Sequence, residues 1–103
     1  MGNSQAKTSL PQAQQEYLLN LYKFTRRVEK HQHTNKRSRG AALELIVAVE
    51  QLSVAAAGKQ HVTELRLLAR VVEKRIGLWQ RATFTAEPPK EFLWTPSADD
   101  VFH

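Results

Sequence analysis

The segment from residue 40 to residue 57 constrains the fold most, because it is apolar on nearly every side. It reads GAALELIVAVEQLSVAAA and carries only two charges, Glu44 and Glu50. A helix that is apolar all round must be buried on more than one side. In a chain of 103 residues a second copy is the simplest cover, so we expect a homodimer. Gly58 is well suited to end this helix.

Residues 63–83 predict another helix, capped by Thr63, with one apolar side and one basic side. At 100° per residue, four cations fall within an arc of roughly 80° that also contains Gly77. They are spaced 4, 4 and 7 residues apart and span about 22 Å of helix. A straight row of cations is suited to tracking a phosphate backbone. This cation row consists of Arg66, Arg70, Lys74 and Arg81, and the opposite, core-facing side consists of Leu65, Leu68, Ala69, Val72, Ile76 and Trp79.

The remaining segments complete a single helical domain over residues 1–103. Tyr17, Leu21 and Phe24 mark the apolar face of a helix that Ser9 can cap. One further helical turn is expected after Pro88-Pro89, where it docks the Phe-Leu-Trp run on the core. We expect a disordered N-terminus over residues 1–10, a helix over 11–30, a basic linker over 31–39, a helical core over 40–94 and a loose tail over 95–103.

These elements predict an all-α protein, since no segment alternates as a strand would. The expected architecture is a small helical bundle of about three main helices plus a short C-terminal helix, forming an antiparallel homodimer. The formal net charge of +5 favours an anionic partner. Because cysteine is absent, disulfides and thiolate metal sites are excluded. No uninterrupted apolar run reaches 18 residues and no secretory signal pattern is present, so we expect a cytoplasmic protein without membrane partners.

No pattern of catalytic chemistry stands out. The chain has no glycine-rich phosphate loop, zinc-ligand spacing or nucleophile elbow, so we expect no enzyme activity, cofactor, metal or small-molecule substrate. Glu44 and Glu50 are six residues apart, which places them on different helix faces. Arg75 points toward the apolar side and either snorkels or pairs with one of these glutamates. His31 and His33 are expected to be solvated loop residues.

Several short motifs lie between residues 43 and 93. Glu64-Leu65-Arg66 is followed after fourteen residues by Arg81-Ala82-Thr83, and a proline-led segment, Glu87-Pro88-Pro89, comes next. A Leu-Glu-Leu-Ile run begins at Leu43. This combination resembles the small RNA-silencing suppressor of insect-infecting nodaviruses. The resemblance implies a helical homodimer whose flat face binds double-stranded RNA without sequence preference, with Lys74 and Arg81 as RNA contacts.

We therefore predict a double-stranded-RNA-binding protein that acts as a viral suppressor of RNA silencing. It would shield long duplexes and small duplex RNA from host processing. A-form RNA is recognised by shape, phosphates and 2′-hydroxyls, which suits a rigid row of cations. The predicted RNA-binding residues are Arg66, Arg70, Lys74, Arg81, Arg37 and Arg39.

Two alternatives remain open. The first is a small helical accessory protein that binds a protein partner through the apolar helix. The bundle proteins that accompany reverse transcriptases resemble this chain in helix order and composition. The second is a DNA-binding protein that uses the basic run Lys36-Arg37-Ser38-Arg39. Base readout from residues 63–83 looks poor, because this segment lacks Asn and its one Gln, Gln80, lies off the cation row.

Overall fold

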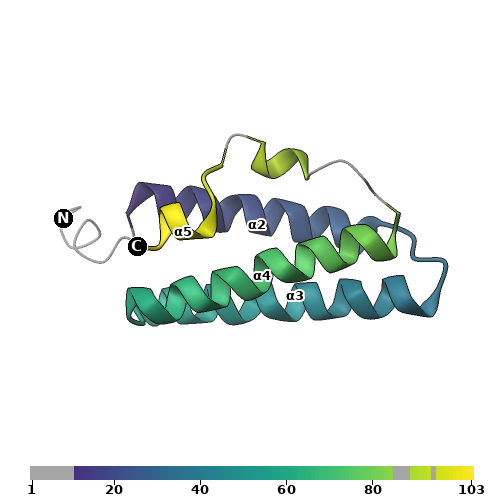
Figure 1. Cartoon of the computed structure of the whole chain (residues 1–103), viewed down its shortest axis with the longest axis horizontal. Helices are drawn as coiled ribbons and strands as arrows, with labels where there is room; N and C mark the ends of the chain where they lie inside the picture. Colours follow the sequence, from purple (N-terminus) through teal and green to yellow (C-terminus); the bar gives the residue numbers. More distant parts are fainter. Residues whose placement is uncertain (1–10, 85–88, 94) are drawn as a thin grey trace, which may run out of the picture.

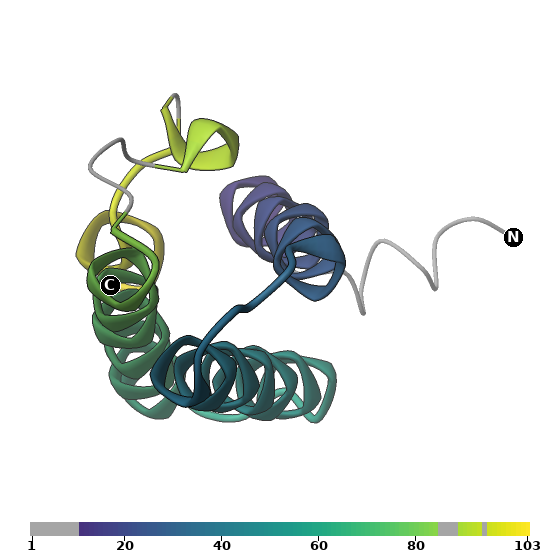
Figure 2. The same cartoon turned by 90° about the vertical axis from the view of Figure 1, so that its right-hand side faces the viewer.

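Three long helices lie side by side in the structure, a computed structural model that describes residues 11–84, 89–93 and 95–103. Each long helix runs antiparallel to the next along the chain (Figure 1). Seen end-on, the three occupy the corners of a triangle (Figure 2). No strand occurs among the described residues, and the predicted all-α bundle is confirmed. The elements are α2 (Gln12–Lys30), α3 (Lys36–Ala57), α4 (Val62–Ala82), the 3₁₀ helix η1 (Lys90–Phe92) and α5 (Ala98–Val101).

The helix α3 begins at Lys36, four residues before the predicted start at residue 40. Asn35 is its N-cap, and the Asn35 side chain accepts a hydrogen bond from the backbone N–H of Ser38 at 2.8 Å. The Ser38 hydroxyl in turn donates to the Asn35 carbonyl at 3.0 Å. The prediction of a basic linker over 31–39 was therefore wrong. The linker covers residues 31–35, and the basic run forms the first turn of α3.

The turn between α3 and α4 also differs from the prediction in detail. Gly58 was expected at C′, the left-handed position after the cap, but it is the C-cap of α3, and the left-handed conformation falls on Lys59, with φ 58°. The backbone N–H groups of Lys59 and Gln60 donate to the carbonyls of Ala56 and Ala55, which is the pattern of a Schellman motif. His61, not Thr63, then caps α4, because its Nδ1 accepts from the Thr63 backbone N–H at 3.1 Å. The predicted Ser9 cap of α2 lies outside the described residues.

The core lies between the apolar sides of the three long helices. From α2, Tyr17, Leu21 and Phe24 are at most 1% exposed, as their spacing predicts. Phe24 packs edge-on against Trp79 of α4, with ring centroids 5.5 Å apart, so the predicted core position of Trp79 is confirmed. Fully burying one large apolar side chain contributes about 1.5–3 kcal/mol. The other large side chains with almost no exposure are Phe102, Leu45, Leu52, Val28 and Val72.

The segment after α4 returns across α2. Phe92 of η1 packs against Tyr17 and Phe24, with ring centroids 6.0 and 5.9 Å apart, as the docking prediction requires. Leu93, by contrast, is 58% exposed and does not dock, and Trp94 lies outside the described residues. The prediction of a loose tail over 95–103 was wrong. Residues 98–101 form α5, which packs on α4 and α2, and Phe102 is fully buried.

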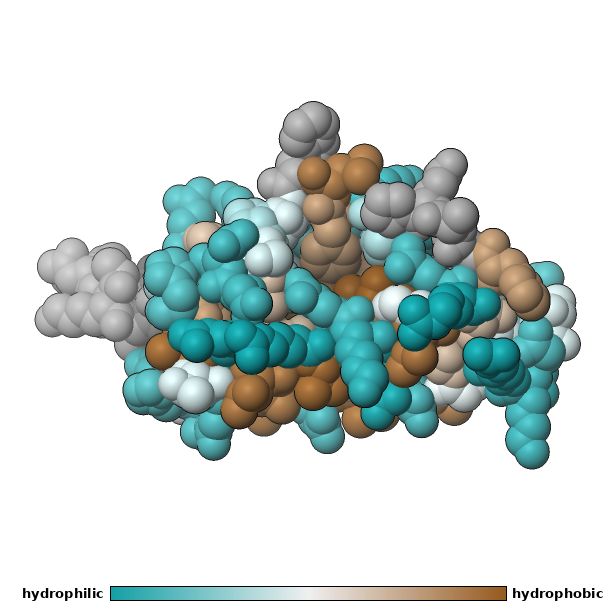
Figure 3. Space-filling view, in the orientation of Figure 1, coloured by the Kyte–Doolittle hydropathy of each residue, from teal (hydrophilic) through white to brown (hydrophobic). Residues whose placement is uncertain are grey.

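None of the described residues covers the outer side of α3. Leu45 and Leu52 point into the core, whereas Leu43, Val47 and Val54 are between 50 and 72% exposed. Brown, apolar surface is visible along α3 and α4 in the lower half of Figure 3. By length and composition, α3 is also apolar enough to cross a membrane, a property it shares with core helices of soluble proteins. One chain therefore buries only part of the helix that the sequence predicts must be buried on several sides.

Candidate nucleic-acid interface

The first half of the cation row is engaged within the chain. Arg66 is half-buried, and its Nε donates a hydrogen bond to the backbone carbonyl of Phe102. The Nε of Arg70 lies 2.8 Å from Oδ1 of Asp99, in an ion pair whose two side chains are 54 and 60% exposed. Both partners come from the segment that contains α5. The row therefore does not present four free cations, as its spacing alone suggested.

The second half of the cation row differs from the first. The side chains of Lys74 and Arg81 are exposed, and neither makes a hydrogen bond or ion pair within the part of the chain that the structure describes. Gly77 lies between them, and beyond its chain neighbours and the adjacent helix backbone, a Cβ atom placed there would meet no described atom within 4 Å. The surface between the two cations is thus open to the close approach of a ligand. The C-terminal half of α4 is the part of the row that can bind an anion directly.

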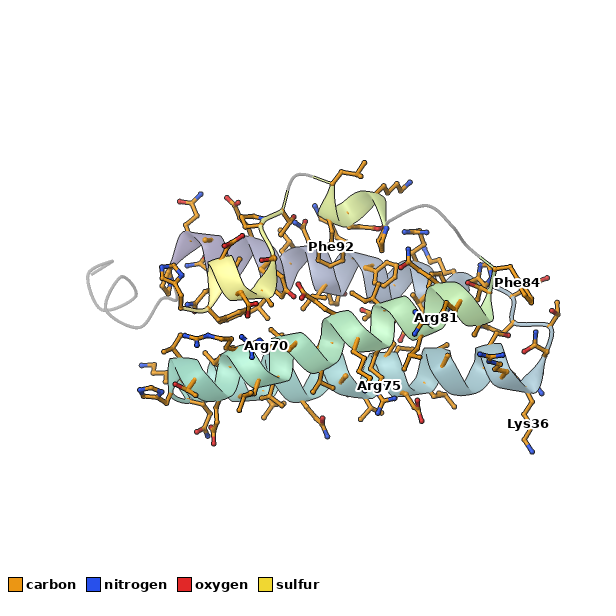
Figure 4. The ribbon with its side chains drawn as sticks, viewed as in Figure 1. Lys36, Arg70, Arg75, Arg81, Phe84 and Phe92 are labelled. Atoms are coloured by element: carbon orange, nitrogen blue, oxygen red, sulfur yellow. The ribbon has the colours of Figure 1, made fainter. Side chains whose placement is uncertain are left out.

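Further cations gather where α2 ends, α3 begins and α4 ends. The antiparallel order brings these three helix ends to one end of the bundle, the right-hand end of Figure 1. Figure 4 shows Lys36 and Arg81 at this same end, on α3 and α4. Among the described residues of these helix ends, Glu29 is the one exposed carboxylate. We call this surface the basic end, and its exposed cations are Arg26, Lys30, Lys36, Arg37, Arg39 and Arg81.

The basic end unites residues that the sequence analysis treated separately. Arg37 and Arg39 were assigned to a basic linker, but the Asn35 cap fixes them in the first helical turn. Arg26 and Lys30 were not assigned to any site, and Lys36 was assigned only in the DNA-binding alternative. The signal that could have found them is the order of three antiparallel helices, each with cations at the same end. Arg66 and Arg70 lie in the other half of the bundle and do not join this group.

The first turn of α3 opposes the helix dipole. Carboxylates are favoured near a helix N-terminus and cations near a C-terminus. The first turn of α3 contains no acidic residue and holds Lys36, Arg37 and Arg39 instead. Such a conflict between a local rule and the observed sequence is typical of a functional surface. An anion bound here would meet both the partial positive charge of the helix end and the three side chains.

Arg27 is one cation at this end that is already neutralised. Its guanidinium makes two hydrogen bonds to the carboxylate of Glu91, at 2.8 and 2.9 Å. These bonds hold the pKa of Glu91 below its usual range and raise the pKa of Arg27. The pair links α2 to η1 across the top of the bundle. Arg27 therefore supports the fold and is not counted in the basic end.

The two linker histidines contact the core, so the prediction of solvated histidines was wrong for His33. The indole N–H of Trp79 donates to Nε2 of His33 at 3.1 Å, and the His31 ring packs edge-on against Trp79 at 5.6 Å. Burial, followed by the neighbouring charge of His31, lowers the pKa of His33. Trp79 is 3% exposed and already bonded, so it does not offer a face for stacking on bases.

Two glutamates, Glu44 of α3 and Glu73 of α4, serve the fold. Nη1 of Arg75 lies 3.0 Å from Oε1 of Glu44, which confirms the pairing of Arg75 with a glutamate of the neighbouring helix. Glu73, at the edge of the cation row, accepts from the Tyr17 hydroxyl at 3.3 Å and from the backbone N–H of Ala98 at 2.8 Å. Burial and the Glu73 charge raise the pKa of Tyr17, so the phenol stays protonated.

Comparison with protein-family models, with curated proteins and with solved structures finds no match to this chain. The assignment of the site therefore rests on the geometry and charge of the chain itself.

Proposed function

We propose that this chain is a non-enzymatic double-stranded-RNA-binding protein whose contacts are to phosphates and ribose hydroxyls. The observation that carries the proposal is the basic end, continued along α4 by Lys74. Six exposed cations stand there against one exposed carboxylate among the described residues of the three helix ends. Phosphate contacts supply affinity without reading sequence.

This surface is better suited to contacting the backbone of duplex RNA than to reading base edges. The free cations lie on rigid helices, and α4 presents Lys74 and Arg81 about 10 Å apart along its axis, at 1.5 Å per residue. A-form RNA exposes phosphates and 2′-hydroxyls and hides most base edges in a deep, narrow groove. Rigid cations at fixed spacing match the regular backbone of a duplex better than a flexible single strand. We therefore expect duplex RNA to bind more tightly than single-stranded RNA of the same length.

The proposal includes a homodimer formed through α3 and α4. An open groove between these helices is lined mainly by apolar side chains, among them Val47, Val54 and Leu67. It continues toward Leu43 and Val71, which are also exposed. A second copy would cover this surface and bury the outer side of α3. An antiparallel pair would place one basic end at each end of the assembly and lengthen the footprint on a duplex.

In this proposal the biological role is suppression of RNA silencing in the cytoplasm of a virus-infected cell. A protein that coats duplex RNA without sequence preference blocks the nucleases that dice long duplexes. It also withholds small duplexes from the silencing machinery. This part of the proposal is supported by the resemblance of residues 43–93 to nodaviral suppressors and by the phosphate-binding character of the basic end.

A gel-shift titration tests the proposed site. The variant Lys74→Ala/Arg81→Ala should bind duplex RNA about tenfold or more weakly than wild type, with a shallower salt dependence because about two phosphate contacts are lost. Helicity and oligomer mass should not change. The matched control, Lys23→Ala/Lys59→Asn, removes the same charge from exposed positions outside the site. If the two variants lose affinity equally, only net charge matters and the site assignment fails.

The groove between α3 and α4 favours a second candidate function, an adaptor that binds another protein. Five large apolar side chains on these helices are at least 42% exposed: Leu43, Val47, Val54, Leu67 and Val71. A contiguous apolar surface of this kind marks interaction sites. A stable complex with a heterologous protein that survives high salt, together with no duplex preference in the gel shift, would favour the adaptor.

Tighter binding to duplex DNA than to duplex RNA would instead favour the DNA-binding alternative.

A further inference from the structure

The segment of residues 97–103, which we call the strap, is held on the bundle by a buried aromatic anchor. Phe102 is fully buried and packs edge-on against Tyr17, with ring centroids 5.5 Å apart. Ala98 and Val101 are also buried. The amide side chain of Gln14 donates to the Val101 carbonyl at 3.5 Å. In Figure 1 the strap, which contains α5, lies beside α2 at the end of the bundle opposite the basic end.

The polar groups of the strap occupy the first half of the cation row. Asp99 pairs with Arg70, and the Phe102 carbonyl accepts a hydrogen bond from Arg66. Glu73 accepts from the backbone N–H of Ala98 and so positions the start of α5 against α4. Figure 4 shows Arg70 on α4 at the strap's end of the bundle, remote from Arg81. A carboxylate and a carbonyl oxygen thus fill the positions that phosphate oxygens would take on these two arginines.

We propose that the strap is an intramolecular competitor for the RNA backbone, an inference that rests on the proposed function. With the strap docked, the ligand meets only Lys74, Arg81 and the basic end. With the strap displaced, the row runs unbroken from Arg66 to Arg81 and the footprint on the duplex becomes longer. The strap therefore limits which ligands bind Arg66 and Arg70, because only a ligand of high charge density can displace it from both side chains.

The strap has the features of a displaceable element. The pair between Arg70 and Asp99 is more than half exposed on both sides, and exposed pairs are weak and screened by salt. The anchor, in contrast, is apolar and indifferent to salt. Rising salt should therefore loosen the charged contacts and leave Phe102 in place. A ligand shifts such an equilibrium only by its differential affinity for the displaced state, which here comes from Arg66 and Arg70.

Two neighbouring aspartates provide a matched pair of variants. Asp99→Asn and Asp100→Asn remove the same charge from the same segment. Asp99 contacts Arg70, whereas the Asp100 carboxylate bonds to the Ser97 hydroxyl at 3.1 Å. We expect Asp99→Asn to raise duplex RNA affinity about threefold over Asp100→Asn and to steepen the salt dependence by about one phosphate contact. Equal affinities for the two variants would overturn the proposal.

A truncation that ends at Pro96 tests the whole strap, and heparin serves as a second polyanion beside duplex RNA. We expect the truncated chain to bind both ligands at least threefold more tightly than wild type. Tighter heparin binding with no RNA binding in any variant would keep the competitor role and overturn the proposed function. If the truncated chain folds and binds both ligands as tightly as wild type, the proposal that the strap competes with the ligand is overturned. If the truncation does not fold, the two aspartate variants decide.

Displacement can be observed directly because the chain has no cysteine. A single cysteine replacing the exposed His103 carries a spin label at the edge of the strap. Saturating duplex RNA should increase the mobility of this label, and the Lys74→Ala/Arg81→Ala variant should require more RNA for the same change. A label that stays equally immobile when RNA is bound would contradict displacement and leave RNA binding itself intact.

Discussion

The two ends of the bundle differ in the burial of a phenylalanine and in whether their arginine side chains have partners within the chain. At the strap's end, Phe102 is fully buried, and Arg66 and Arg70 both have partners. At the basic end, Phe84 is 91% exposed, and Arg81 has no partner among the described residues. Where the chain folds back on itself it neutralises its cations, and where it does not the cations remain available. The difference locates the ligand surface more sharply than net charge does.

The largest expected effect is a difference in the free energy of unfolding between variants of Phe102 and Phe84. Phe102→Ala should lower the free energy of unfolding by about 3–5 kcal/mol if the strap stays docked, because it leaves a cavity beside Tyr17. Phe84→Ala should change it by less than about 0.5 kcal/mol, because Phe84 is exposed. Urea unfolding followed by circular dichroism measures both. Equal losses for the two variants would contradict the comparison of the two ends.

The next effect concerns the first turn of α3. Lys36→Glu/Arg37→Glu should weaken duplex RNA binding by about tenfold or more, since charge repulsion replaces phosphate contacts. The free energy of unfolding of the same variant should rise by about 0.3–1 kcal/mol per substitution, because carboxylates are favourable near a helix N-terminus. Gel shift and urea unfolding are the two measurements. A variant that loses stability together with binding would show that these cations serve the fold instead.

A smaller effect is expected in the turn between α3 and α4, remote from the basic end. Lys59 is a non-glycine residue with φ 58°, at the position of a Schellman motif where glycine is preferred. Lys59→Gly should raise the free energy of unfolding by about 0.5–1 kcal/mol. Duplex RNA affinity should stay unchanged in the same gel shift. A loss of affinity comparable with that of Arg81→Ala would extend the ligand surface beyond the basic end.

The smallest effect is a pH dependence at His33. Its pKa is lowered by burial and by His31, so the folded state favours the neutral ring that accepts from Trp79. The stabilisation that the neutral His33 ring provides is present above the histidine pKa of the unfolded chain, about 6.5. It is lost as the pH falls through the lower pKa of His33 in the folded chain. Between pH 7 and pH 5 the wild type should therefore lose stability relative to His33→Gln. A constant difference across this range in urea unfolding would disprove the linkage.

Much of the helical architecture could be predicted because its signals are local. The spacing of Tyr17, Leu21 and Phe24 gave the buried side of α2, and the position of Trp79 in the apolar arc gave its burial. One tertiary contact, the pair of Arg75 and Glu44, was among the alternatives that the sequence offered, because Arg75 is a charge on the apolar side of its helix. The early start of α3 also had a local signal, since Asn35 and Ser38 have the spacing of an N-cap interaction.

The division of the cation row could not be predicted in the same way. A helical wheel treats Arg66, Arg70, Lys74 and Arg81 as equivalent, and the difference arises from contacts more than 25 residues away in sequence. The sequence of the tail, with two aspartates and a single Phe/Trp/Tyr residue, Phe102, reads as slightly acidic and loose. Its order depends on Phe102 finding space beside Tyr17, which is a property of the assembled bundle.

The most direct test maps the contact of duplex RNA on the labelled chain by nuclear magnetic resonance. We expect the first amide shifts at residues 36–39 and 74–81, and shifts at Val101 and Phe102 only as the RNA approaches saturation. The order reflects ligand binding at the free cations before displacement of the strap. Shifts confined to the apolar groove around Val47 and Leu67, with none at the basic end, would contradict the account.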